Sequence, residues 1–500
     1  MEILTAGQMR DADKETTANI MPESQLMENA GFAAACQIAR RYGKRPVTVL
    51  CGAGNNGGDG FVVARLLIQR GWFVEVVFVG DERKMSPAAA SNAERFKGGV
   101  RPLSLQRLKN AEKDNRLFVD AVFGTGLSRP VTGDIADFFN ALNETDAPCV
   151  ALDIPSGVCA DTGEVLGTAP FCDMTVTFCR PKIGHFLYPA KERAGDLIVC
   201  PIGISDETVA RQHPSVYENT PDLFSIPASA PYDNKYSRGA VLVRAGEMTG
   251  AARLAAAAAR RAGAGWVGVS CDGSLQPPFT FDAETVVRPA DTPEAFKAQL
   301  TDRKIAAAVI GMGLAETPRI RDFLDILSAS GKPFVADAGA LPFIKTVKDP
   351  SRAVVTPHAG EFHRLFPDIA GKNKLKQAVS AAKTLNCVIV LKGADTVIAA
   401  PDGRAAVNVT TAFNLATAGS GDVLDGVIGA MLAKSLPPFE SACAGVWLHS
   451  RAAESVNKIN LTASDIIDAL GEIRSSPTHR RRTFPQKTKP SITKKSSKRI

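Results

Sequence analysis

The chain has 500 residues, of which 45% are hydrophobic and 22% charged, a composition typical of soluble globular proteins. This length exceeds what one hydrophobic core supports, so we expect two or three domains. The formal net charge of +7 comes from the segment 475–500, which holds nine Lys or Arg and no acid, so the remainder carries about −2. A folded body without a basic excess argues against nucleic-acid binding as the main role.

Cysteine use and hydrophobicity indicate a cytoplasmic protein with no membrane partner. The ten cysteines are scattered without a Cys-x-x-Cys pair, which is typical of reduced core residues and not of a disulfide framework or a zinc site. The N-terminal residues include early acids and no apolar core, unlike a signal peptide. The apolar run at 254–264 is interrupted by Arg260 and Arg261 and is too short to span a bilayer.

The first half alternates segments with strand and helix character. Helices are expected within 8–41, and later helices at 61–70, 87–97 and 134–142. Short apolar segments rich in β-branched residues predict strands at 47–51, 73–79, 117–123 and 150–154. This βαβα order predicts an open parallel sheet with helices on both faces.

A glycine-rich turn follows the first of these strands, from Cys51 to Gly60 (CGAGNNGGDG). Three of its glycines satisfy G-x-G-x-x-G, a dinucleotide fingerprint that is weak on its own. The turn also holds Asn55, Asn56 and Asp59. Side-chain carbonyls and a carboxylate in such a turn can bind a hard cation or hold ribose and amide groups.

Two later strand ends carry matching chemistry. Asp120 ends a strand and begins a glycine turn, and Asp153 begins Asp-Ile-Pro-Ser-Gly, which includes Ser156. In open α/β sheets ligands bind at the carboxyl ends of the strands, so these groups are expected to meet Asp59 in one pocket. Each motif alone is also compatible with a turn capped by its own aspartate, but three in succession favour the pocket.

These motifs, in this order, resemble the YjeF N-terminal family of NAD(P)HX epimerases over about residues 1–210. The resemblance implies a Rossmann-like three-layer domain that interconverts R- and S-NAD(P)HX, with Asp153 handling the proton. It implies a potassium ion bound by Asn56, Asp120 and Ser156. The residues implied to hold the hydrated nicotinamide nucleotide are Asn55, Asn56, Gly57, Gly58, Asp59, Gly124, Thr125, Gly126, Leu127, Ser128, Arg129, Pro130 and Asp153. We infer that Arg129 supplies positive charge next to the substrate phosphates.

A stretch rich in Pro and Ser at 213–234 predicts a linker. A second alternation follows, with an Ala-rich helix at 250–262 and helices after Ala418 and near 439–458. Strands are expected at 240–245, 266–271, 307–310, 334–336, 353–356, 388–391 and 396–399. The second half is therefore also α/β. The segment 475–500 is almost free of apolar residues and is expected to be disordered; a contact with RNA or acidic surfaces and a solubilising role both stay open.

The segment from Asn414 to Gly426 (NLATAGSGDVLDG) opens an apolar helix after a polar stretch. Free backbone N–H groups in the turn 418–421, at the positive end of that helix, would form an anion site. Asp422 at its rim can accept a proton from a hydroxyl that attacks phosphorus. Alone, the pattern fits a capped helix start equally well.

Other strand ends in the second half carry Lys392, a candidate phosphate partner, and His358, a candidate ring contact. Taken singly, each is more often a solvated lysine or a structural histidine. Together with the Asp422 segment they resemble the ADP/ATP-dependent NAD(P)HX dehydratase family, which has a ribokinase-like fold, over about residues 230–470. The resemblance implies Asp422 as the catalytic base and Mg²⁺ with ADP or ATP as cosubstrate.

The resemblance also implies two sets of ligand contacts in the second half. The residues implied to bind the nucleotide are Lys392, Gly393, Ala394, Asp395, Thr396 and Gly421. Those implied to bind NAD(P)HX are Ala251, Gly313, His358 and Asp422.

The chain departs from the dehydratase pattern at four places. Met312 stands in the family's Gly-Pro-Gly, Gly339 replaces the second acid of Asp-Ala-Asp, and Ala359 replaces a proline. Residues 411–414 replace Gly-Asn-Pro-Gly. These changes remove turn stiffness and one carboxylate but keep the base. We therefore expect the same dehydration reaction, and a lowered rate of dehydration stays an open alternative.

We therefore predict an epimerase domain at 1–212, a linker at 213–234, a dehydratase domain at 235–474 and a basic tail at 475–500. We expect the protein to be a multifunctional isomerase and lyase that repairs NADHX and NADPHX and assembles as a homo-oligomer. Two alternatives remain. A ribokinase-like kinase of a vitamin or small alcohol leaves the first half unexplained, and a non-enzymatic nucleotide-binding scaffold leaves Asp153 and Asp422 unexplained.

Overall fold

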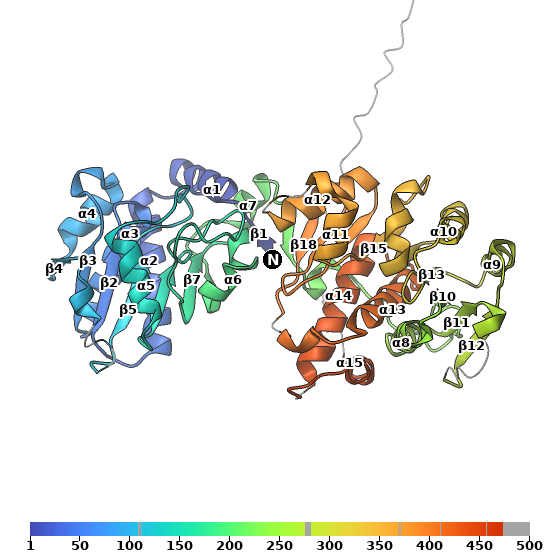
Figure 1. Cartoon of the computed structure of the whole chain (residues 1–500). Coiled ribbons are helices and arrows are strands. Elements are labelled where there is room, and N and C mark those ends of the chain that lie inside the picture. The colour runs from blue at the N-terminus through green and yellow to red at the C-terminus, as the bar shows by residue number, and fades with distance from the viewer. Residues whose placement is uncertain are drawn as a thin grey trace, which may run out of the picture.

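The computed structural model describes residues 1–473 except 109–110, 112, 276–281, 370, 372, 411 and 457. Figure 1 shows two lobes side by side, the first in blue to green and the second in yellow-green to red, each built around one sheet. Both sheets are mainly parallel and are covered by helices, which confirms the predicted α/β class for both halves.

The first lobe contains a seven-stranded parallel sheet in the order β4-β3-β2-β5-β6-β7-β8. Its strands are β2 (Val47–Cys51), β3 (Val74–Phe78), β4 (Val100–Pro102), β5 (Leu117–Ala121), β6 (Cys149–Leu152), β7 (Met174–Phe178) and β8 (Asp196–Cys200). Its helices are α1 (Ala6–Asn19), α2 (Glu23–Arg41), α3 (Asn55–Gln69), α4 (Pro87–Arg95), α5 (Asp134–Asn143), α6 (Lys191–Ala194) and α7 (Asp206–Arg211).

The central strands of this sheet are apolar throughout because both of its faces are buried. Along β2, Val47 and Val49 pack against α2 and α3, whereas Leu50 packs against α5 on the opposite face. The predicted three-layer arrangement is therefore confirmed.

The second lobe contains an eleven-stranded sheet in the order β1-β9-β18-β17-β16-β15-β14-β13-β10-β11-β12. Its strands are β1 (Glu2–Ile3), β9 (Val216–Glu218), β10 (Ala240–Arg244), β11 (Trp266–Cys271), β12 (Thr285–Pro289), β13 (Ala307–Ile310), β14 (Phe334–Ala336), β15 (Ala353–Val355), β16 (Val388–Leu391), β17 (Val397–Ala399) and β18 (Ala405–Val407). It is parallel from β12 to β16, and β17 runs antiparallel to both of its neighbours.

Helices cover both faces of this second sheet. One core packs β10 residues such as Val241 against α8 (Thr249–Arg261), α13 (Ser420–Ala433), α14 (Pro438–Ser455) and α15 (Ala463–Leu470). The other packs Leu242 against α9 (Pro293–Leu300), α10 (Arg319–Ala329), α11 (Ala359–Leu365) and α12 (Lys374–Leu385). Adjacent residues of one strand thus belong to different cores, as the pleat requires.

Strands from the first residues and from the expected linker complete the second sheet. β1 pairs antiparallel with β9, and β9 pairs parallel with β18. Figure 1 places β1 and the N-terminus beside β18, between the two lobes. The segment 213–234 therefore holds a strand of the second lobe, while the exact domain boundaries stay a prediction.

Loops also join the lobes. The backbone N–H of Tyr188 donates to Asp395 Oδ2 at 3.0 Å, and Lys191 Nζ donates to the carbonyl of Thr410 at 3.2 Å. In addition, Asn373 Nδ2 donates to the carbonyl of Asp161 at 3.0 Å. A loop of the first lobe thus contacts the segment 392–396 of the second.

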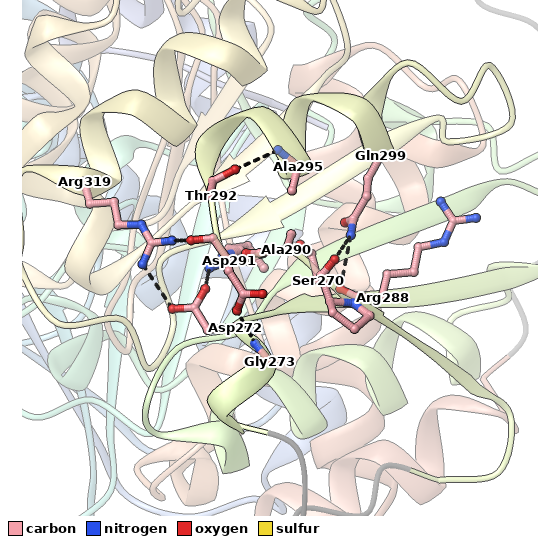
Figure 2. A network of polar contacts seen from close by, with 12 residues as sticks. Ser270, Asp272, Gly273, Arg288, Ala290, Asp291, Thr292, Ala295, Gln299 and Arg319 are labelled. Atoms are coloured by element: carbon pink, nitrogen blue, oxygen red, sulfur yellow. Dashed lines mark hydrogen bonds and ion pairs between the residues drawn. The ribbon is translucent and has the colours of Figure 1, made fainter.

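A partly buried polar network joins the loops at the far end of the second sheet (Figure 2). Arg244, at the end of β10, donates to the Ala290 carbonyl at 2.9 Å and forms an ion pair with Asp272. Arg319 bonds the other oxygen of Asp272 at 3.2 Å and also donates to the Asp291 carbonyl. Because Asp272 is paired with both arginines, we interpret the network as structural.

In the described part of the chain, no helix combines the length and hydrophobicity that crossing a membrane requires. The predicted tail, 475–500, lies outside the described residues.

Candidate functional sites

A cavity of about 1010 Å³ opens where β2, β3, β5 and β6 end in the first lobe. This volume lies at the upper end of the usual range for ligand pockets and suits a nucleotide. Of the sequence-predicted residues, those lining it are Asn55, Asn56, Asp59, Gly124, Thr125, Gly126, Leu127, Ser128, Arg129 and Asp153. Asp59 and Asp153 therefore meet in one pocket as expected, whereas Asp120 and Ser156 do not line it.

Three other predicted residues, Gly57, Gly58 and Pro130, are not among the lining residues. Gly57 has a packing role, since a Cβ there would lie 1.8 Å from the carbonyl oxygen of Gly52. This contact lets α3 begin close to the end of β2, which turns the N–H groups of its first turn toward the cavity.

Asp120 and Ser156 lie beneath the cavity and are fully buried. The Ser156 hydroxyl donates to Asp120 Oδ1 at 2.6 Å, and its backbone N–H donates to Oδ2 at 2.7 Å. Burial raises the pKa of Asp120 to about 6, although the bonds from Ser156 oppose it. The structure thus brings Asp120 and Ser156 together.

Asn56 completes a set of hard oxygen donors. Its Nδ2 donates to the carbonyl of Phe123 at 3.1 Å, and Ser156 Oγ lies 3.2 Å from that same carbonyl. Asn56 Oδ1 is buried and has no hydrogen-bond partner within the described residues. An orphaned carbonyl oxygen beside a carboxylate, a hydroxyl and a main-chain carbonyl fits an alkali or alkaline-earth cation.

Asp153 follows β6 and has a left-handed backbone, with φ of 62°. Burial opposes its ionisation, but the Lys182 ammonium 2.5 Å from its Oδ1 holds the pKa of the carboxyl below its usual value. Two nearby cavity acids behave oppositely. Burial and the Asp153 charge raise the pKa of Asp59 well above normal, and burial raises that of Asp13 to about 6. The cavity therefore contains an ionised acid beside protonatable ones.

The second site forms at the start of α13. Its N-cap, Gly419, has φ of 83°, a left-handed conformation that suits glycine. Asp422 lies in the first turn, where burial and then the charge of Asp337 raise its pKa to about 6. A carboxyl group that titrates near neutrality at a helix N-terminus can remove a proton beside a bound anion.

Lys392, which follows β16, is paired with a different acid. Its Nζ lies 2.8 and 3.0 Å from the two carboxylate oxygens of Asp337, which follows β14. A Cβ on Gly421 would lie 3.5 Å from Nζ, so this ammonium is also adjacent to the predicted anion site. Lys392 is therefore anchored and is not a freely solvated lysine.

Asp425 is a buried acid of this site that the sequence analysis did not single out. Thr356 Oγ1 donates to its Oδ1 at 2.9 Å, and burial together with Asp337 raises its pKa well above normal. Its protonated form can hydrogen-bond Asp337. Its spacing of three residues from Asp422 on one helix is the signal that would have found it.

Two further residues predicted to contact ligands in the second site, His358 and Asp395, have structural partners within the chain. His358 caps α11, since its Nδ1 accepts the Gly360 N–H at 3.0 Å, although its ring is more than half exposed. Asp395 bonds Tyr188 of the first lobe and pairs with Lys374 at 2.5 Å. Whether these residues also touch ligands stays a prediction.

The glycine that stands where the dehydratase pattern has an acid also has a structural reason. A Cβ on Gly339 would lie 2.3 Å from the carbonyl oxygen of Leu314. The loop that contains Gly313 therefore occupies the space that a side chain at position 339 would need. Gly313 itself has φ of 70° and is packed against the Met248 carbonyl.

Comparisons with known proteins cover both lobes. The family model described as YjeF-related protein N-terminus matches residues 23–184, and the one described as NAD(P)H-hydrate dehydratase matches 241–474. The bifunctional NAD(P)H-hydrate repair enzymes Nnr of Moorella thermoacetica and Salinibacter ruber are each 34% identical to this chain, over 94% of it and 96% of their own length. A solved structure of ADP/ATP-dependent NAD(P)H-hydrate dehydratase from Bacillus subtilis, co-crystallized with ATP/Mg²⁺, is 30% identical over 51% of this chain and 97% of its own, with a TM-score of 0.45.

Proposed function

This chain belongs to the family of bifunctional NAD(P)H-hydrate repair enzymes, and from that premise we propose that it restores hydrated NADH and NADPH in two steps. The first lobe exchanges R- and S-NAD(P)HX, and the second dehydrates the S epimer with ADP or ATP. The observation that supports this best is the presence of two aspartate sites, at Asp153 and Asp422, in two lobes of one chain. A single-step kinase would leave the first of them unused.

In the first lobe, inversion at the hydroxyl-bearing ring carbon needs a group that handles a proton at the substrate oxygen. Asp153 is proposed for this role because it is ionised and lines the cavity. The first turn of α3 and the loop 124–130 would hold the dinucleotide, with Arg129 near its phosphates.

A potassium ion fits the oxygen set of Asn56, Asp120 and Ser156, as the orphaned Asn56 Oδ1 indicates. When bound, it would supply positive charge that neutralises Asp120. The residues themselves fix the position of the 123–124 loop against α3, since Phe123 bonds both Asn56 and Ser156.

In the second lobe, Asp422 takes the proton from the ring hydroxyl as that oxygen attacks the terminal phosphorus of ADP or ATP. The bond to the departing nucleotide breaks, and the N–H groups at the start of α13 with Lys392 stabilise the transferred charge. The ring nitrogen lone pair then expels phosphate, and the adjacent ring carbon loses a proton to give NAD(P)H.

Magnesium is expected to accompany the nucleotide. Among the described residues no cluster of three or more His, Cys, Asp or Glu could hold a metal ion. Mg²⁺ commonly binds mainly through substrate phosphates and water, so it would enter on the nucleotide. The bifunctional architecture favours ADP over ATP. The domain boundaries, the cytoplasmic location and the homo-oligomeric state stay part of this proposal.

The decisive experiment follows recovery of NADH absorbance from purified NADHX with ADP or ATP. Complete recovery from a mixture of both epimers is expected, because the first lobe supplies the S epimer continuously. If recovery of NADH stops when the S epimer is consumed, the proposed epimerase activity of the first lobe is wrong. A stable phosphorylated product without NADH would instead favour a ribokinase-like kinase.

A further inference from the structure

Lys182 is a fully buried lysine between β7 and the short helix at Ile183–His185. It lines the cavity of the first lobe beside Asp153. We propose that Lys182 is the positioning residue of the epimerase site, fixing one oxygen of Asp153 so that the other faces the substrate. This inference rests on the proposed epimerase function and deepens it.

The bonds of the ammonium group show why Lys182 acts through Asp153. Nζ lies 2.5 Å from Asp153 Oδ1, 2.9 Å from Thr177 Oγ1 and 3.2 Å from the Phe178 carbonyl. A lysine ammonium has three protons, and these three acceptors use all of them. No proton of Lys182 is left for a substrate, which distinguishes a positioning residue from a catalytic one.

The two oxygens of the Asp153 carboxylate have different surroundings. Oδ1 accepts from Lys182 and also from the Thr177 hydroxyl at 3.0 Å. For Oδ2 the described residues provide no hydrogen bond, and a Cβ on Gly124, which lines the cavity, would lie 3.9 Å from it. Oδ2 is therefore the oxygen available to a ligand in the cavity.

His185 fixes the backbone of the same pair. Its Nδ1 accepts the Lys182 backbone N–H at 2.9 Å, so its Nε2 carries the ring proton and donates to the Asp153 carbonyl at 2.9 Å. Burial, followed by the Lys182 charge, lowers the pKa of His185 to about 4, which keeps the ring neutral and both bonds intact. This clamp holds Asp153 in a left-handed backbone conformation that residues other than glycine adopt uncommonly.

Lys182 also supplies the positive charge that balances the acids around Asp153. Asp13 on α1 and Asp59 on α3 line the same cavity, and burial together with the charge of Asp153 raises the pKa of both, while the Lys182 charge opposes this rise. Without Lys182, the ionised form of Asp153 would lose the main group that offsets its burial, and the bond from Thr177 would remain.

The test compares the full-length chain with its Lys182→Met variant in epimer exchange. We expect kcat to fall about 100-fold with KM nearly unchanged, and the acid limb of kcat/KM to move to higher pH. Thr177→Val is the matched control, because it removes a hydroxyl bonded to both groups but keeps the ion pair; we expect a fall of a few-fold and little movement of the acid limb. Circular dichroism and thermal unfolding of the same preparations report folding of the whole chain, and ADP-dependent dehydration reports an intact second lobe.

Wild-type kcat in Lys182→Met would overturn the proposal, and so would a fall in kcat with an unmoved acid limb, which indicates a merely structural lysine. Should Lys182→Met fail to fold, Lys182→Arg decides, because it keeps the charge and is expected to keep the acid limb in place. A shifted limb in folded Lys182→Arg contradicts the role. If instead the wild-type chain exchanges no epimers, the epimerase function itself fails.

Discussion

Asp153 in the first lobe and Asp422 in the second each have a lysine nearby, fully buried Lys182 and partly buried Lys392, but the lysines bind differently. Lys182 bonds Asp153 directly, whereas Lys392 bonds Asp337 and leaves Asp422 facing the negative charge of that pair. Burial disfavours ionisation of both acids; the bond from Lys182 outweighs it and lowers the pKa of Asp153, whereas burial and then the Asp337 charge raise the pKa of Asp422 to about 6. A lysine that bonds the reactive carboxyl itself offsets its burial, whereas a lysine that bonds a neighbouring acid offsets it less.

The largest expected effect separates the two sites by mutation. Asp422→Asn should lower dehydration about 1000-fold or more, since it removes the base, while exchange of the epimers continues. The matched variant Asp153→Ala should slow exchange and leave consumption of the S epimer intact. Chromatographic separation of the epimers with NADH absorbance measures both rates. Unchanged dehydration in Asp422→Asn would exclude Asp422 as the base.

The second expected effect is a difference in pH dependence. A base works only when deprotonated, so dehydration should decline as pH falls through about 6, reaching about a tenth of its plateau at pH 5. Epimer exchange should persist at pH 5, because the pKa of Asp153 lies below its normal value near 4. Steady-state kcat/KM for each reaction between pH 4.5 and 8 gives the two acid limbs. Coincident limbs would contradict the comparison.

The smallest expected effect concerns the oxygen cluster beneath the first site. Replacing K⁺ by Na⁺ should slow epimer exchange several-fold, up to about tenfold, because the smaller ion would fit the oxygen set of Asn56, Asp120 and Ser156 less well. Asn56→Ala should be slow in both salts and lose this response. Exchange rates at equal ionic strength measure it, and an identical rate in both salts with wild type would argue against a potassium site.

The parallel core of each lobe was predictable because buried strands are uninterrupted apolar runs. The segments 47–51, 266–271 and 388–391 match β2, β11 and β16, and the helix expected at 61–70 begins earlier, at Asn55. Strands β1, β4, β9 and β18 were missed, since they have two or three residues and their apolar pattern is too short to read. For the same reason, the Pro- and Ser-rich composition around β9 indicated only a linker. The five-residue strands β7, β8 and β12 were also missed, because polar or charged residues interrupt their apolar runs.

At the sites, motifs identified the groups that follow strands but not their partners. Asp120, Asp153 and Ser156 come from short signatures in chain order, and the structure brings them together. Lys182 had no such signature, because its role depends on a contact with Asp153 made through the fold. Asp337 is the first acid of the stretch that the sequence analysis compared with Asp-Ala-Asp. Its pairing with Lys392 joins the ends of two strands across 55 residues of chain and was not predictable.

The contribution of Glu2 and Ile3 to the second sheet has a practical consequence for anyone who alters the ends of this protein or divides it. A recombinant fragment that starts near residue 235 lacks both β1 and β9, and the exposed backbone of β18 becomes a template for self-association. Affinity tags or trimming at the amino terminus would likewise disturb a lobe whose reactive acid lies more than 400 residues downstream. The two reactions are therefore better separated with point mutants than with truncated chains.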